Sequence, residues 1–87
     1  GFTGVFSVLE GGQKTPAEYW GLGITPLDQE IEVIVGKKGE FYLENLKPGN
    51  YPARLFTKGK ECRFEIAIPD DKEQVMVPLG ELTCTLP

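Results

Sequence analysis

Apolar and polar residues alternate with a period of two along most of this chain. In residues 30–35, for example, Ile31, Val33 and Val35 alternate with Glu30 and Glu32. Successive side chains of a β-strand point to opposite faces of a sheet, so this period predicts strands that bury one face. The predicted strands cover residues 2–9, 19–25, 30–35, 40–44, 51–57, 62–68 and 74–79. No comparable stripe has the 3.6-residue period of an amphipathic helix.

Glycine and proline residues separate the predicted strands. The chain has 11 Gly and 7 Pro, and both residues favour turns over regular structure. Residues 36–39 and 58–60 are predicted to be tight hairpin loops. Pro52 has no N–H for a ladder, so its strand is predicted to lie at a sheet edge or to carry a bulge. Short strands spaced about ten residues apart predict one all-β domain over residues 1–87, a β-sandwich of about seven strands.

The inward faces of these strands predict a single core between two sheets. Its predicted members are Ile31, Val33, Phe41, Leu43, Leu55, Phe64, Ile66, Val75 and Val77. Three other large apolar residues, Ile34, Tyr42 and Phe56, fall on outward faces of their strands. Two interpretations remain open: either a second sheet or a loop covers them, or they form a surface for a protein partner.

Composition and charge exclude some functions. Thirteen acidic residues oppose nine basic ones, giving a net charge of −4, whereas a nucleic-acid binder needs a cationic surface. No apolar run approaches the ~20 residues of a membrane helix, so this domain is not expected to span a membrane itself. The chain begins at Gly1 without an initiator Met. We therefore expect a domain excised from a larger protein, with a residual tag at its start.

The two cysteines, Cys62 and Cys84, lie in the last two apolar segments. A metal site, a reactive thiol and a disulfide are the alternatives. Two cysteines without any histidine do not complete a common zinc site, and the sequence has no CxxC motif. These facts favour a structural disulfide, which indicates the periplasm or the outside of the cell. Closing such a loop of about 23 residues stabilises a domain by roughly 3 kcal/mol.

Most catalytic arrangements are missing from the residue inventory. The sequence has no histidine, which excludes Ser-His-Asp and Cys-His sites. Ser7 is the only serine, and no glycine-rich phosphate-binding motif occurs. Glu40 and Glu44 share a face, as catalytic carboxylates would, but solvent-exposed glutamates are far commoner. No catalytic, cofactor or metal-binding residue is predicted, and we expect a protein that is not an enzyme.

Residues 34–51 resemble a known family. Their sequence, IVGKKGEFYLENLKPGNY, resembles the (V/I)G-x-x-G-x-[FVL]-Y-L-x-x-L-x-x-G signature in the C-terminal domain of bacterial outer-membrane ushers. The later Cys62-x-Phe64 and the closing LGELTC of residues 79–84 are similar to the end of that domain, including its cysteine pair. The first thirty residues lack the usual proline-phenylalanine-glycine opening. This departure indicates an atypical or archaic-type chaperone–usher system.

The resemblance implies a specific function and location. An usher is an outer-membrane barrel with periplasmic domains, and its C-terminal domain is a β-sandwich. That domain receives complexes of periplasmic chaperone and pilus subunit while the fimbria is assembled and secreted, and it contacts other usher domains. The implied location is the periplasmic face of the bacterial outer membrane. Neither a cofactor nor a nucleic acid is implied.

Two other interpretations stay open. Residues 39–51 also fit the G-x-[FY]-x-[FL]-x-x-[LI]-x-P-G-x-Y hairpin of CnaB-like and carboxypeptidase-regulatory-like modules. Those modules are transthyretin-like sandwiches that serve as spacers in surface proteins, whereas the usher resemblance leaves an immunoglobulin-like sandwich equally open. A carbohydrate-binding sandwich would need a row of exposed aromatic residues, for which only Trp20 and Tyr42 are available.

Overall fold

The computed structural model describes residues 1–70 and 75–87, which form eight strands and one short 3-10 helix. The elements are β1 (Phe2–Glu10), β2 (Gln13–Pro16), β3 (Gly21–Ile24), β4 (Ile31–Ile34), η1 (Lys37–Gly39), β5 (Glu40–Leu43), β6 (Gly49–Thr57), β7 (Lys60–Ile68) and β8 (Val77–Thr85). None of these described elements is an α-helix. Among the described residues, no helix is long and apolar enough to cross a membrane.

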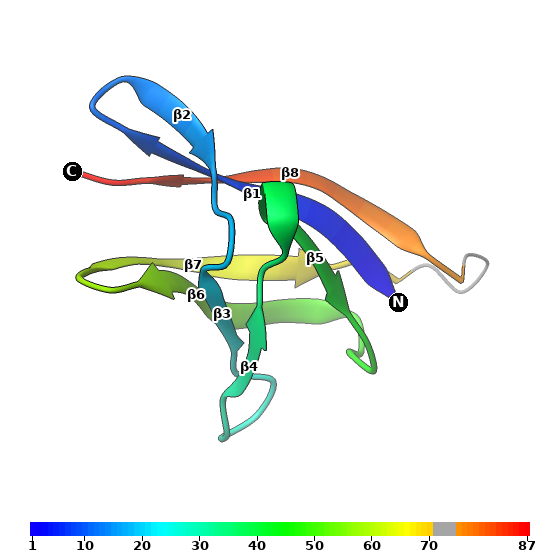
Figure 1. The fold of residues 1–87 in the computed structure, drawn as a ribbon. Coiled ribbons are helices and arrows are strands. Elements are labelled where there is room, and N and C mark those ends of the chain that lie inside the picture. The colour runs from blue at the N-terminus through cyan, green and yellow to red at the C-terminus, as the bar shows by residue number, and fades with distance from the viewer. Residues whose placement is uncertain (71–74) are drawn as a thin grey trace.

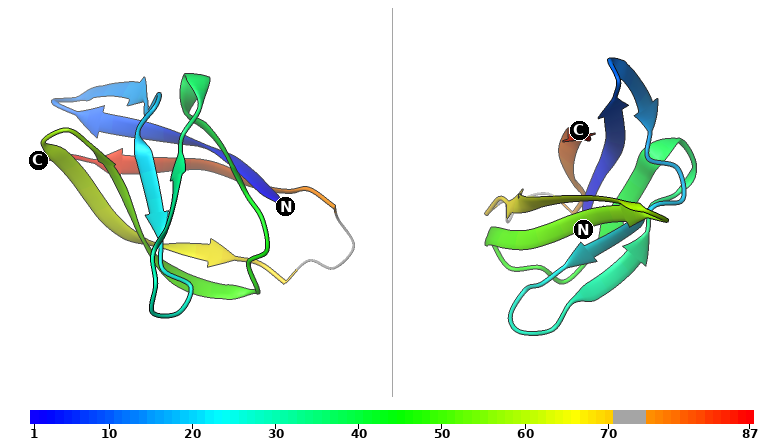
Figure 2. Two further views of the ribbon diagram at one scale, coloured as in Figure 1. Left: turned by 60° about the horizontal axis from the view of Figure 1, so that its bottom comes forward. Right: turned by 90° about the vertical axis from the view of Figure 1, so that its left-hand side faces the viewer.

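The strands form two sheets that face each other (Figures 1 and 2). In the first sheet, β1 pairs in parallel with β8 on one side. On its other side β1 pairs antiparallel with β5 along its first half and with β2 along its second. The second sheet is antiparallel in the order β4-β3-β6-β7. The prediction of an all-β sandwich is confirmed.

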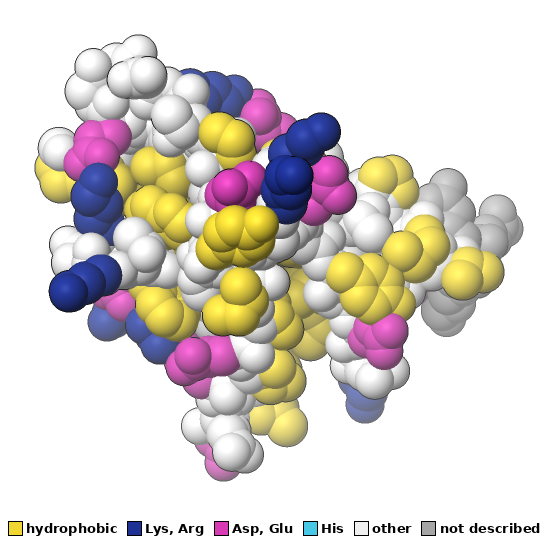
Figure 3. Space-filling view, viewed as in Figure 1, with side chains coloured by type: hydrophobic (Ala, Val, Ile, Leu, Met, Phe, Trp, Pro, Cys, Tyr) yellow, Lys and Arg dark blue, Asp and Glu magenta, His cyan; other side chains and the backbone are white. Residues whose placement is uncertain are grey.

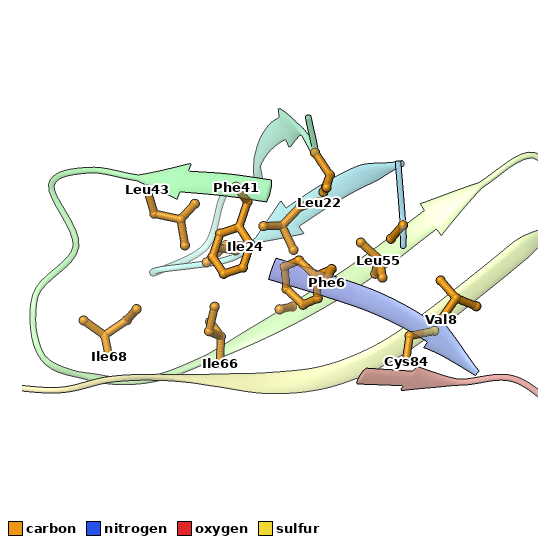
Figure 4. Packing of buried hydrophobic residues seen from close by; sticks show 13 residues of the cluster. Phe6, Val8, Leu22, Ile24, Phe41, Leu43, Leu55, Ile66, Ile68 and Cys84 are labelled. Atoms are coloured by element: carbon orange, nitrogen blue, oxygen red, sulfur yellow. The ribbon is translucent and has the colours of Figure 1, made fainter. Parts of the chain in front are cut away.

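Phe6 on β1 lies at the centre of the core between the sheets (Figure 4). Its ring centroid lies 4.5 Å from that of Phe41 and 5.6 Å from that of Phe64, so aromatic residues from both sheets meet here. Of the nine predicted core residues, five are buried: Phe41, Leu43, Leu55, Ile66 and Val77. Val33 and Phe64 are partly buried and pack against that cluster.

The remaining two predicted core residues are exposed, which corrects the prediction. Ile31 keeps 51% of its surface and Val75 keeps 85%. Ile31 lies on β4, the outermost strand of its sheet, and Val75 precedes the start of β8. Alternation identifies the face on which a side chain lies, but it does not distinguish a central strand from an edge strand.

The hairpin predicted at residues 36–39 does not exist. The strands β4 and β5 that flank these residues belong to different sheets, and η1 carries the chain across. Gly39 has a φ of +82°, and a Cβ there would collide with the carbonyl oxygen of Phe6. Glycine at this position therefore allows the crossing to pack closely against β1.

The strand with Pro52 is internal and pairs with β7 without a register shift, so both predicted alternatives, an edge position and a bulge, are wrong. β6 lies between β3 and β7. Its ladder with β3 ends at Ala53, and the next carbonyl, that of Pro52, accepts a 3.0 Å hydrogen bond from Thr25 N–H. The missing N–H of Pro52 therefore falls where pairing with β3 stops, which is why an internal strand tolerates proline.

Strand β8 contains an irregularity that the periodicity did not predict. Between Thr3 and Val5 on β1, the partner strand has one extra residue. Gly80 has a φ of +79° at this bulge. Before the bulge Val77 is buried and Leu79 packs against the core, and after it Leu82 and Cys84 pack there, so the bulge restores inward alternation along one continuous strand. The prediction ended this strand at residue 79, where the alternation changes phase.

Candidate protein-binding surface

The disulfide predicted between Cys62 and Cys84 is confirmed. It joins β7 of one sheet to β8 of the other, with the two Cα atoms 5.9 Å apart. This cross-link closes the side of the sandwich where the outer edges of β7 and β8 lie. The opposite side, formed by β4 and β5, has no covalent link. Two of the three candidate binding residues, Ile34 of β4 and Tyr42 of β5, lie on that side, whereas Phe56 lies on the internal strand β6 and pairs with Glu61 of β7.

Ile34 and Phe56 lie in one row across the outer face of the second sheet. Gly21 on β3 pairs with Ile34 of β4 on one side and with Phe56 of β6 on the other. The Phe56 ring lies over Gly21, in the space that a Cβ there would fill. The Arg54 guanidinium lies 4.0 Å from the centre of that ring. Phe56 is therefore on the outer face, as predicted, but only partly exposed.

Arg54 is the centre of a charged cluster on the same face. It contacts Glu30 at 2.7 Å, Glu61 at 3.3 Å and Glu32 at 3.4 Å. Hydrogen bonding to Arg54 lowers the pKa of Glu30, and hydrogen bonding to Arg63 lowers the pKa of Glu61. The pKa of Arg54 is raised, and hydrogen bonding to Glu30 is the largest cause. These contacts hold Glu30 over Gly23 and give this face a fixed polar border.

Ile34 and Tyr42 line the same hollow, whose volume is about 920 Å³. Ile34 is 72% exposed and Tyr42 is 45% exposed. Lys37 and Lys38 of η1 line it as well, together with Glu40. The structure thus places Ile34 and Tyr42 along one hollow, and Ile34 and Phe56 in one row with Gly21 between them. Tyr42 and Phe56 line different hollows.

A second, apolar groove lies between β4 and β5 and has a volume of about 250 Å³. It is lined by Ile24, Ile31, Val33, Tyr42, Leu43, Glu44 and Leu46. In Figure 3 it corresponds to the notch between the arm built by β3 and β4 and the arm that follows β5, with apolar side chains along it. Sequence reasoning missed this groove because it placed Ile31 and Val33 inside the core. One signal was available in the sequence: Ile34 places an apolar residue on the otherwise polar outer face of this strand.

Tyr42 shares the outward face of its strand with Glu44. Hydrogen bonding to Glu44 raises the pKa of the Tyr42 hydroxyl, because a nearby carboxylate disfavours the phenolate. Tyr42 therefore stays neutral at ordinary pH and presents a ring with one polar end. Its ring also covers Gly1, where an added Cβ would lie 2.6 Å from the ring.

Ser7, whose hydroxyl is a possible nucleophile, lies in a cluster with the charged residues Glu81 and Lys14. Ser7 donates a 2.9 Å hydrogen bond to Glu81, and Lys14 donates one of 2.5 Å to the same carboxylate. Hydrogen bonding to Lys14 lowers the pKa of Glu81, which weakens this carboxylate as a base. Ser7 is only 5% exposed. The arrangement is suited to linking β1, β2 and β8 rather than to attacking a substrate.

The structure also bears on two other kinds of site, a carbohydrate-binding surface and a metal site. Trp20 packs against the core, so the row of exposed aromatics needed for carbohydrate binding loses its largest member. Within residues 1–70 and 75–87, no three His, Cys, Asp or Glu side chains gather as metal ligands would.

No protein-family model matches the chain, and no curated protein sequence matches it. Among solved structures, a 5-hydroxyisourate hydrolase from Klebsiella pneumoniae is similar over 97% of this chain and 91% of its own, with a TM-score of 0.55 and 13% identity. A 9R-lipoxygenase from Cyanothece aligns over 93% of this chain and 16% of its own, with a TM-score of 0.48 and 13% identity. The first likeness shows a transthyretin-like fold.

The hydrolase likeness corrects one expectation. We expected a protein that is not an enzyme, and that expectation is contradicted because a structure with this fold is itself an enzyme. At 13% identity the likeness shows the fold alone and assigns no reaction to this chain.

Proposed function

We propose that this chain is a protein-binding domain that docks partners through Ile34 and Tyr42. The observation that carries the proposal is that both side chains are exposed at the surface and line one hollow. Excluding water from apolar side chains that line one surface hollow lowers the free energy of the complex with a partner. Phe56 extends this surface along the row through Gly21.

The resemblance of residues 34–51 to outer-membrane ushers supplies the partner. On this proposal the domain belongs to an usher of an atypical or archaic-type system and works at the periplasmic face of the outer membrane. It receives complexes of chaperone and pilus subunit and also contacts other usher domains. The inter-sheet disulfide supports an oxidising compartment of this kind, and Ile34 and Tyr42 both lie within the segment that carries the resemblance.

The test is a calorimetric titration of the domain with its cognate chaperone–subunit complex. Ile34→Ala and Tyr42→Ala should each weaken binding by about 1–2 kcal/mol, as truncation of a desolvated anchor does. Leu27→Ala is the matched control, because Leu27 is an exposed apolar residue that lines neither hollow. Equal affinity in all variants would refute the docking surface. No binding by the unmodified domain would favour the spacer interpretation.

A further inference from the structure

The groove between β4 and β5 lies where two sheet edges are unpaired. Within the described part of the chain, β4 pairs only with β3 and β5 pairs only with β1. Figure 1 shows the two strands diverging from η1, and residues of both strands line the groove. An unpaired strand edge presents backbone N–H and C=O groups that another strand can bind.

The hydrogen bonds next to β4 indicate which of its backbone groups face outward. Val35 N–H donates to Trp20 at 2.8 Å, and Val35 C=O accepts from Tyr19 at 3.0 Å. Both bonds point toward the β3 side. Because backbone groups of successive strand residues point to alternate sides, those of Ile34 and Glu32 point away from β3. These two residues therefore offer the free edge.

The side chains beside this edge are apolar. Ile31 and Val33 of β4 line the groove opposite Leu43 and Leu46, and Ile31 keeps half of its surface exposed. A strand added to β4 would continue the second sheet, and its inward side chains would cover these residues. The edge formed by β7 and β8 differs, because the Cys62–Cys84 disulfide closes it.

The charges at the Ile31 end of the groove favour a cationic side chain on the partner there, whereas Lys37 and Lys38 line the hollow at the Ile34 end. Glu44 lines the groove directly, and no Lys or Arg of residues 1–70 and 75–87 is among its lining residues. Among the described residues no ion pair involves Glu44. Glu32 lies on the edge of β4 and is mostly exposed, with only a 3.4 Å contact to Arg54. Opposite charges at the border of an apolar site set orientation and partner choice.

From these features we infer that the outer edge of β4 binds an extended segment of a partner protein. The segment pairs with Glu32 and Ile34 through its backbone. Its alternate apolar side chains enter the groove, and a Lys or Arg next to them faces Glu44. This mode is β-strand addition, in which backbone bonds supply affinity and alternate side chains supply specificity. The inference deepens the proposed function, on which it rests for the identity of the partner.

A synthetic peptide tests the inference without the natural partner. The probe is acetyl-Lys-Val-Thr-Val-Thr-Val-Lys-amide, titrated into the isotope-labelled domain and followed by NMR. We expect shift changes confined to residues 31–34 and 42–46, and at least tenfold slower amide exchange at Glu32 and Ile34. A peptide of the same composition with its three valines adjacent should bind at least tenfold more weakly. Replacing both lysines by glutamates should also weaken binding.

A matched pair of variants tests the backbone contact. Glu32→Pro removes the outward N–H, whereas Glu32→Ala removes the same carboxylate and keeps the N–H. We expect the proline variant to bind at least tenfold more weakly than the alanine variant. If the proline variant does not fold, Ile31→Lys replaces it as the test. Ile31 is half exposed, and we expect this variant to bind at least tenfold more weakly as well. Equal binding of both peptide orders, or slowed exchange on another strand, would overturn the inference.

The two proposals fail separately. Loss of chaperone–subunit binding with intact peptide binding refutes the usher assignment and leaves the groove established. Peptide binding that is absent at millimolar concentration refutes the groove, whatever the docking titration with Ile34 and Tyr42 variants shows.

Discussion

Cys62 of β7 is covalently joined to Cys84 of β8, 22 residues later, so the disulfide connects the two sheets. Its stabilisation comes mainly from restricting the unfolded chain. We predict that replacing both cysteines by serine lowers the free energy of unfolding by about 2–5 kcal/mol. Urea unfolding with and without a reducing agent measures this. The reductant should reproduce most of the loss in the unmodified domain and change nothing in the double variant.

Apart from the disulfide, the predicted features that agree with the structure are those set by local alternation. The inward faces of residues 40–44 and 62–68 were assigned correctly because period two identifies a face. The errors concern which strands lie side by side. Residues 36–39 look like a hairpin loop, yet η1 crosses between sheets, and Ile31 lies at an edge. Neither fact is encoded in alternation, because pairing is decided by contacts between residues far apart in sequence.

The candidate site was predictable only in part. The outward positions of Ile34, Tyr42 and Phe56 followed from the alternation and agree with the structure. The partial burial of Phe56 did not follow, because its ring packs on Gly21, which is 35 positions away and has no side chain that would suggest the contact. The groove beside Ile31 was hidden by the assumption that every inward apolar residue is buried.

The packing of Phe56 over Gly21 gives a second prediction. Gly21→Ala places a methyl group where the ring lies, and overpacking of this kind costs about 1–3 kcal/mol. Phe56→Ala should cost about 1–2 kcal/mol through lost burial and the lost Arg54 contact. In the Phe56→Ala background the added methyl should cost much less. A double-mutant cycle by urea unfolding measures this coupling, and additive effects would contradict the contact.

The Arg54 cluster gives a prediction about pH. The pKa values of Glu30 and Glu61 are lowered in the folded state. Their contribution to stability is therefore complete above the ordinary glutamate pKa of about 4.3 and is lost as pH falls through the lower folded-state values. We expect the urea midpoint to fall between pH 5 and pH 3. Arg54→Met should flatten this dependence, whereas Lys58→Met, outside the cluster, should leave it unchanged.

The last prediction concerns Gly80, whose φ of +79° places it in the left-handed region. An added Cβ would meet nothing within 4 Å. A substitution here therefore lowers stability through the backbone conformation and not through a clash with neighbouring atoms. The left-handed region raises the conformational free energy of residues that have a Cβ. The increase is smaller for asparagine than for β-branched residues. We therefore predict that Gly80→Ala lowers stability by about 1 kcal/mol, that Gly80→Val lowers it further, and that Gly80→Asn lowers it least. Thermal and urea unfolding of the three variants gives the ranking. Equal stabilities would mean that the bulge relaxes, in which case the inward positions of Leu82 and Cys84 would no longer depend on a glycine at this position.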